Sequence, residues 1–139
     1  MRIATTSEEP MDYRILVCDD DSEIRSAMRR TLHRHHVTAV GSVREAMDEL
    51  RLRRYHAVVS DFDLQAASDG LEFLQLVRVM YPELVRFMVT GNTELQVAIR
   101  AVNEGSVHRY FLKPWDDVAL SAALEIQLHA SGCAALDAR

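Results

Sequence analysis

The chain has 139 residues, of which 48% are hydrophobic and 27% charged, and its formal net charge is −5. This length suits one domain with a single core, and the acidic balance argues against a nucleic-acid surface, which needs a basic face. No apolar stretch is long enough to cross a bilayer, and the start of the chain lacks the apolar segment of a secretion signal. We therefore expect a cytoplasmic globular protein that contacts neither nucleic acid nor membrane.

Beyond a polar arm at residues 1–12, short apolar runs alternate with longer segments of helical period. The apolar runs predict five strands, at 15–18, 37–40, 56–60, 84–89 and 110–112. Apolar residues at helical spacing follow each strand and predict five helices, over 24–32, 43–50, 71–80, 95–102 and 120–128. We expect one domain at 13–130, followed by a short tail at 131–139.

Several residues are placed to begin or end these helices. Asp21 with Ser22 suits a helix start, and Ser42 with Glu45 has the spacing of a capping box. Asn92 or Thr93 is predicted to cap the fourth helix. Pro82 and Gly105 are expected to end the third and fourth helices. Alternating strands and helices favour an α/β fold, in which a parallel sheet is covered on both faces.

Polar residues stand where these strands end. In a parallel sheet the carboxyl ends meet at one edge, and ligands bind there. Gathered carboxylates repel each other, and a hard cation such as Mg²⁺ neutralises them. An ammonium and a hydroxyl beside them suit the oxygens of a phosphoryl group. The residues concerned are Asp19, Asp20, Asp21, Asp61, Asp63, Thr90 and Lys113.

Five motifs occur in order along the chain: ILVCDDD, VVSDFDL, SDGLEFL, MVTGN and YFLKPW. Together they resemble the receiver domain of two-component response regulators, and the resemblance extends from Tyr13 to His129. It implies a flavodoxin-like, doubly wound (βα)5 fold with five parallel strands in the order 2-1-3-4-5. It also implies a signalling phosphoacceptor that catalyses only its own phosphorylation and dephosphorylation.

The resemblance further implies a role for each matching residue. Asp61 is the phosphoacceptor, and Thr90 and Lys113 bind the phosphoryl oxygens. Asp61 also shares Mg²⁺ with three other groups, namely the carboxylates of Asp19 and Asp20 and the main-chain carbonyl of Asp63. Thr90 and Tyr110 form the conformational switch, although Tyr110 also fits a half-buried strand aromatic. The peptide before Pro114 is expected to be cis.

The implied partners are a sensor histidine kinase or a histidine phosphotransfer protein as the phosphodonor. A downstream protein or a fused output domain is expected to contact the face made by the helix at 95–102, the strand at 110–112 and the helix at 120–128. Homodimer formation stays open, as does the question whether the chain is a fragment of a longer regulator.

The chain departs from the family pattern after the phosphoacceptor. Gln65 stands where a proline is usual, and the loop QAASDG is one residue longer than common. Asp63 and Asn92 occupy the variable positions that tune phosphoryl lifetime in the family. An alternative is a haloacid-dehalogenase-like phosphatase, with Asp61 as nucleophile and Asp63 as general acid. Gln65 and the position of Asp19 and Asp20 before the nucleophile count against it. A second alternative is an interaction module that only keeps the fold.

The remaining candidates have structural explanations. His33, His35 and His36 suggest a metal site, but we place them at the end of the first helix, where cations complement the helix dipole. Cys18 and Cys133 lie too far apart for a disulfide framework and are expected to be free thiols, Cys18 as a buried small hydrophobe. Trp115 is predicted to be structural, and the arginines at 51, 53 and 54 to form a solvated helix end.

Overall fold

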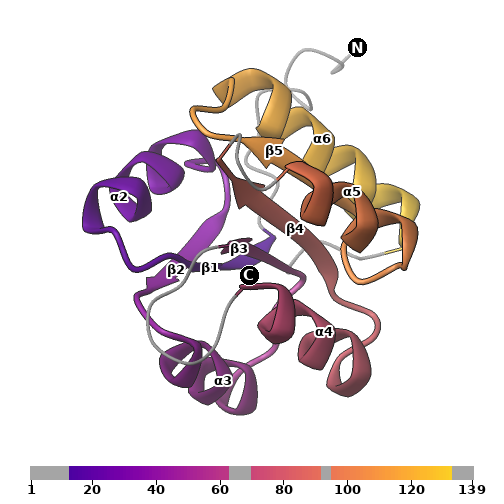
Figure 1. Ribbon diagram of the computed structural model, residues 1–139. Helices are drawn as coiled ribbons and strands as arrows, with labels where there is room; N and C mark the ends of the chain where they lie inside the picture. Colours follow the sequence, from indigo (N-terminus) through magenta and orange to yellow (C-terminus); the bar gives the residue numbers. More distant parts are fainter. Residues whose placement is uncertain (1–12, 63–69, 92–94, 133–139) are drawn as a thin grey trace, which may run out of the picture.

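Five parallel strands form the centre of the molecule, in the order β2-β1-β3-β4-β5 (Figure 1). The computed structural model describes residues 13–62, 70–91 and 95–132. Its strands are β1 Arg14–Cys18, β2 His36–Val40, β3 Ala57–Asp61, β4 Val85–Thr90 and β5 Arg109–Leu112. Its helices are α2 Ser22–Thr31, α3 Val43–Leu52, α4 Gly70–Met80, α5 Leu95–Asn103 and α6 Asp117–Ala130. The predicted fold class and strand order are confirmed.

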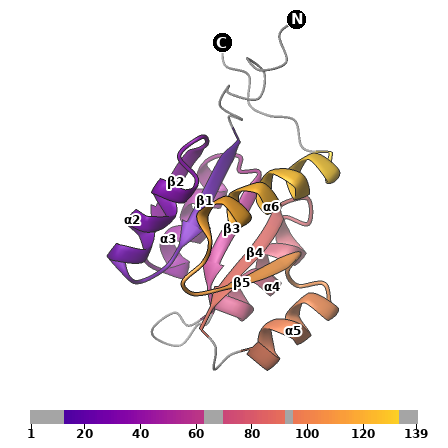
Figure 2. The same cartoon turned by 90° about the horizontal axis from the view of Figure 1, so that it is seen from above.

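The sheet carries a separate core on each face, because successive residues of a strand point to opposite sides. On β1, Ile15 and Val17 pack with α2 and α6, whereas Leu16 and Cys18 pack with α3, α4 and α5. The helices accordingly lie in two layers, and Figure 2 shows α2 and α5 at opposite sides of the molecule. Cys18 is buried as predicted, and burial with the neighbouring negative charge of Asp19 raises the pKa of its thiol to about 12. Cys133 lies outside the described residues.

The helix starts follow the capping residues found in the sequence. The Asp21 carboxylate accepts a hydrogen bond of 2.9 Å from the Glu23 N–H and so caps α2. Ser42 Oγ accepts from the Glu45 N–H at 3.1 Å, and the Glu45 carboxylate in turn accepts from the Gly41 N–H at 2.9 Å. These bonds satisfy main-chain donors that a helix start leaves without partners. The predicted caps Asn92 and Thr93 lie outside the described residues.

The ends of two strands lie one residue beyond their predicted positions. Asp61 and Thr90 are the last residues of β3 and β4, whereas we expected both to follow the strands. The ladders continue because the Phe62 N–H donates to the Val89 carbonyl at 2.9 Å and the Lys113 N–H donates to the Thr90 carbonyl at 2.8 Å. Both site residues are therefore held by the sheet itself.

The three histidines do not share one environment, so the prediction that they gather at a helix end is wrong for two of them. His33 follows α2, and its Nδ1 lies 3.1 Å from the Arg30 carbonyl. His35 is buried and its Nε2 lies 3.0 Å from a carboxylate oxygen of Glu125 in α6. His36 begins β2. Local periodicity could not reveal the contact with Glu125, which lies 90 residues away in the sequence.

Trp115 and the arginine cluster have the predicted structural roles. Trp115 Nε1 donates to Thr31 Oγ1 at 2.8 Å, which connects the start of α6 with the end of α2. Arg51 and Arg53 are exposed at the end of α3 and pair with acidic residues of the same helix. In the part of the chain that the structure describes, no helix has the length and apolar character needed to span a membrane.

Candidate phosphorylation site

Three carboxylates gather at the carboxyl edge of the sheet. Asp19 and Asp20 follow β1, and Asp61 ends β3, the neighbouring strand. One oxygen from each carboxylate lies within 4.8 Å of the others. Within residues 13–62, 70–91 and 95–132, this acidic cluster is the one group of three or more residues placed to bind a metal ion. Its oxygen donors are those that hard divalent cations prefer.

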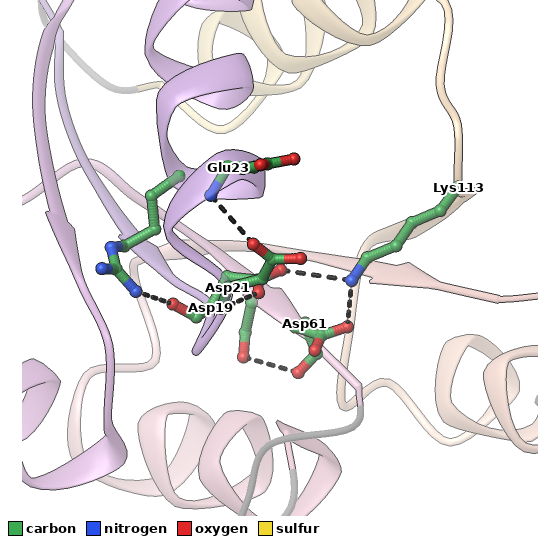
Figure 3. Close-up of polar contacts among 7 residues, drawn as sticks. Asp19, Asp21, Glu23, Asp61 and Lys113 are labelled. Carbon is green, nitrogen blue, oxygen red and sulfur yellow. Dashed lines mark hydrogen bonds and ion pairs between the residues drawn. The ribbon is translucent and has the colours of Figure 1, made fainter.

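A single ammonium faces the buried members of the acidic cluster (Figure 3). Lys113 follows β5, and its Nζ lies 2.8 Å from Asp61 Oδ1 and 3.2 Å from Asp19 Oδ2. The side chains of Asp19 and Asp61 are 3% and 6% exposed, so these contacts form largely out of water. The peptide between Lys113 and Pro114 is cis, as predicted.

The pKa directions show how this charge is shared. Burial alone lowers the pKa of Lys113, but hydrogen bonding and charge from Asp61, with a smaller contribution from Asp19, raise it above its ordinary value. Burial raises the pKa of Asp19 and outweighs the opposing effects of the Asp21 N–H and Lys113. The two directions differ because the ammonium is stabilised by two carboxylates, whereas Asp19 shares one ammonium with Asp61. The site therefore retains an excess of negative charge, which a bound cation can offset.

Gly70, the first residue of α4, packs directly on the main chain of Asp61. The Gly70 N–H donates to the Phe62 carbonyl at 2.7 Å. A Cβ at position 70 would lie 1.8 Å from the Asp61 carbonyl oxygen, which is far inside van der Waals contact. That oxygen also accepts a hydrogen bond of 3.0 Å from Ser60 Oγ. The motif SDG predicts the entry to this helix, but nothing in the motif indicates that its glycine touches the candidate phosphoacceptor.

Thr90 and Tyr110 lie on the same face of the sheet, on neighbouring strands. In the register of β4 and β5, Thr90 lies beside Leu112 and Met88 lies beside Tyr110. Thr90 and Met88 are two residues apart on β4 and so point to the same face, which Tyr110 shares with Met88. Thr90 is fully buried and its hydroxyl donates to the Gly91 carbonyl at 3.3 Å. Tyr110 is half-buried against the core beneath α3, α4 and α5. Both predicted switch residues are thus in one layer; the loop residues Asp63, Gln65 and Asn92 lie outside the described residues.

The chain matches known proteins over most of its length. The family model of the response regulator receiver domain matches residues 15–125. The hydrogenase transcriptional regulatory protein HoxA of Cupriavidus necator is 38% identical over 102 residues, which are 73% of this chain and 21% of that protein. The response regulator protein FleR of Pseudomonas aeruginosa is 30% identical over 112 residues, which are 79% of this chain and 23% of that protein. The chain thus spans about a quarter of these relatives.

Solved structures agree with these matches. The signal receiver domain of an HD domain-containing protein from Pseudomonas fluorescens superposes with a TM-score of 0.79 at 28% identity, covering 88% of this chain and 90% of that one. The receiver domain of NtrX from Brucella abortus gives a TM-score of 0.78 at 27% identity, covering 83% and 98%. These matches do not support the haloacid-dehalogenase-like alternative, which we therefore abandon.

Proposed function

Because this chain belongs to the response regulator receiver domain family, we propose that Asp61 accepts a phosphoryl group from a histidine kinase or a histidine phosphotransfer protein. The observation that carries the proposal is the position of its carboxylate, at the end of β3, inside the acidic cluster and 2.8 Å from the Lys113 ammonium. A nucleophilic carboxylate needs cations beside it that absorb the charge of the incoming phosphoryl group. Lys113 supplies one such cation, and the acidic cluster has the donors to hold a second.

We propose Mg²⁺ as the cofactor of this site. The acidic cluster fits it, because three carboxylates offer hard oxygen ligands within 4.8 Å while a single ammonium opposes their charge. Asp19, Asp20 and Asp61 would hold the ion, with the main-chain carbonyl of Asp63 completing the protein ligands. When bound, Mg²⁺ neutralises charge on the phosphoryl oxygens during transfer.

In the transfer, an Asp61 carboxylate oxygen forms a bond to phosphorus while the bond from phosphorus to the donor's histidine nitrogen breaks. The electron pair of that bond stays on the nitrogen, so no oxidant or reductant is needed. Lys113 moves from the unphosphorylated Asp61 carboxylate toward a phosphoryl oxygen, and the Thr90 hydroxyl binds another. The domain thus catalyses its own phosphorylation and, by positioning water, its dephosphorylation.

Phosphorylation would then change the face made by α5, β5 and α6. The shared layer of Thr90 and Tyr110 supports this, because a hydroxyl drawn toward the phosphoryl group frees space into which the aromatic ring moves. The relatives named above are regulatory proteins about four times longer than the matched region. We therefore propose that residues 13–130 form the receiver and act in the cytoplasm on a fused output domain or a separate partner.

Intact mass measurement tests the proposal. The wild-type chain is incubated with a small-molecule phosphodonor and Mg²⁺, beside Asp61→Asn and the matched control Asp48→Asn, whose carboxylate is exposed on α3. We expect one phosphoryl group on the wild type and on the control, none on either when Mg²⁺ is chelated before the donor is added, and none on Asp61→Asn. Equal labelling of Asp61→Asn would reject Asp61 as the phosphoacceptor. Labelling that is unchanged by chelation would reject Mg²⁺ as the cofactor. Failure of the wild type with both this donor and a phosphorylated histidine phosphotransfer protein would favour the interaction module.

A further inference from the structure

Arg25 lies beside the acidic cluster but does not pair with its carboxylates. Its Nη1 donates a hydrogen bond of 2.8 Å to the main-chain carbonyl of Asp19. Among the described residues the guanidinium lies within ion-pair distance of no carboxylate. The direct contact between Arg25 and the acidic cluster is therefore a hydrogen bond to the main chain and not an ion pair.

The position of this side chain is specified by its neighbours. Arg25 lies near the start of α2, and its main-chain N–H donates to the Asp21 carbonyl at 3.0 Å. Its guanidinium reaches back toward the start of the helix, although the helix dipole disfavours a cation there. Gly41 lies close to the guanidinium, since a Cβ at position 41 would lie 3.1 Å from Arg25 Nη1 and would crowd it. The Asp19 N–H donates to the Val40 carbonyl at 3.0 Å, so the ends of β1 and β2 enclose the contact.

The carbonyl that Arg25 binds belongs to the peptide joining Asp19 to Asp20. The Asp19 main chain is already held by the bond from its N–H to the Val40 carbonyl, so fixing the oxygen of this planar peptide sets its plane and with it the Cα position of Asp20. Asp19 is already held through its side chain, by the Asp21 N–H at 2.9 Å and by Lys113. Asp20 is half-buried, and its carboxylate has no such support among the described residues. The direction of the Asp20 side chain thus depends on the peptide that Arg25 holds.

We propose that Arg25 is a positioning residue for the Mg²⁺ site, which orients the Asp19–Asp20 peptide so that both carboxylates face one ion. This inference rests on the proposed function, because it assumes that the acidic cluster binds Mg²⁺. Residues that orient metal ligands without touching the metal typically change affinity by about 10- to 100-fold when they are replaced.

Positioning and simple charge have opposite consequences, which makes the inference testable. A cation near a Mg²⁺ site repels the ion, so loss of its charge alone should tighten binding. Loss of the hydrogen bond to the Asp19 carbonyl should instead weaken binding. Arg29 supplies a matched control, because it lies one turn further along α2 and is exposed. Arg25→Gln and Arg29→Gln remove the same charge, but only the first removes the bond.

The experiment is a titration of the unphosphorylated protein with Mg²⁺, in which binding is monitored by calorimetry and by the fluorescence of Trp115. Trp115 is the single tryptophan and lines a cavity together with Lys113. We expect about tenfold weaker binding in Arg25→Gln and no weakening in Arg29→Gln. Wild-type or tighter affinity in a folded Arg25→Gln would overturn the inference and leave the proposed function intact. Absence of Mg²⁺ binding in the wild type would instead overturn the proposed function.

Gly41→Ala keeps the test decisive if Arg25→Gln does not fold. An alanine Cβ crowds the guanidinium at 3.1 Å while every charge stays in place. We expect this variant to bind Mg²⁺ a few-fold more weakly than the wild type. Unchanged affinity in a folded Gly41→Ala, with the wild type binding normally, would count against the inference.

Discussion

The two ends of the sheet both bury charge, but they neutralise it in different ways. At the carboxyl end, two buried carboxylates share one ammonium, and burial still raises the pKa of Asp19. At the opposite end, the buried guanidinium of Arg86 near the start of β4 donates to four main-chain carbonyls, those of Pro82, Leu84, Gly105 and Ser106. One strand, β4, connects the two arrangements, with Arg86 near its start and Thr90 at its end.

The Arg86 end has a structural role, whereas the acidic end is suited to bind a ligand. Main-chain carbonyls accept hydrogen bonds from all three guanidinium nitrogens of Arg86, so no ligand is required there. The acidic cluster keeps an excess of negative charge that is unfavourable without a cation. Loss of charge at the Arg86 end should therefore reduce stability alone, whereas loss of charge at the acidic end should remove the chemistry and can increase stability.

The largest effect is expected at the structural end. Arg86→Met fills similar space but leaves the buried carbonyls without donors, so we expect the free energy of unfolding to fall by about 3 kcal/mol. Urea denaturation followed by circular dichroism measures this change. Arg78→Met is the matched control: Arg78 is exposed and donates to one carbonyl, that of Glu104, so a loss below about 1 kcal/mol is expected. An Arg86→Met variant that is folded yet cannot be phosphorylated would remove the distinction between the two ends.

The next effect is expected where α4 meets the candidate phosphoacceptor. A Cβ in Gly70→Ala would lie 1.8 Å from the Asp61 carbonyl oxygen, so the strand end or the helix must move by roughly an ångström. A displacement of this size at a reacting group can reduce the rate about 100-fold, and we expect this for phosphorylation from a small-molecule donor. Gly91→Ala is the control, because a Cβ there meets no atom within 4 Å. Wild-type rates in both variants would show that α4 does not set the position of Asp61.

In the absence of Mg²⁺, the stability of the protein should depend on pH through Asp19. Burial raises the folded-state pKa of Asp19, so the folded protein binds this proton more tightly than the unfolded chain does. The contribution of Asp19 to stability is therefore most favourable below its ordinary pKa of 3.8 and falls as the pH rises through the folded-state value. Asp19→Asn does not titrate, and at neutral pH we expect it to be more stable by about 1 kcal/mol.

Thermal unfolding of the wild type and Asp19→Asn across pH 3.5 to 7 measures this difference. The gap should open as the pH rises and should shrink when Mg²⁺ is added, because the ion stabilises only the wild type strongly. Asp48→Asn, on the exposed surface of α3, controls for loss of a carboxylate elsewhere. A variant less stable than the wild type at every pH would mean that Lys113 already compensates the cluster.

The two ends were not equally predictable from the sequence. Asp61, Thr90 and Lys113 were identified because each stands where an apolar run ends, a local pattern that parallel strands convert into one edge. Arg86 lies inside the apolar run predicted as a strand, and its partners are main-chain carbonyls, which carry no sequence signal. The same reason hid the contacts of Arg25 with the Asp19 carbonyl and of Gly70 with the Asp61 carbonyl. Contacts between side chain and distant main chain depend on how elements pack, which periodicity does not report.

The smallest effect is expected at a structural contact that lies beside the functional end. Trp115 stands two residues after Lys113 in the sequence. Its Nε1 donates to Thr31 Oγ1 at 2.8 Å and lies 3.1 Å from Asp117 Oδ1. Trp115→Phe keeps most of the ring but loses this donor, and Thr31 still bonds to Asp117, so we expect a loss of about 0.5 kcal/mol in unfolding free energy. Phosphorylation should be unchanged, because the bond joins α2 to α6 without involving the acidic cluster. A slower reaction in Trp115→Phe at unchanged stability would show that this contact positions Lys113, and the functional region would then extend to the end of α2.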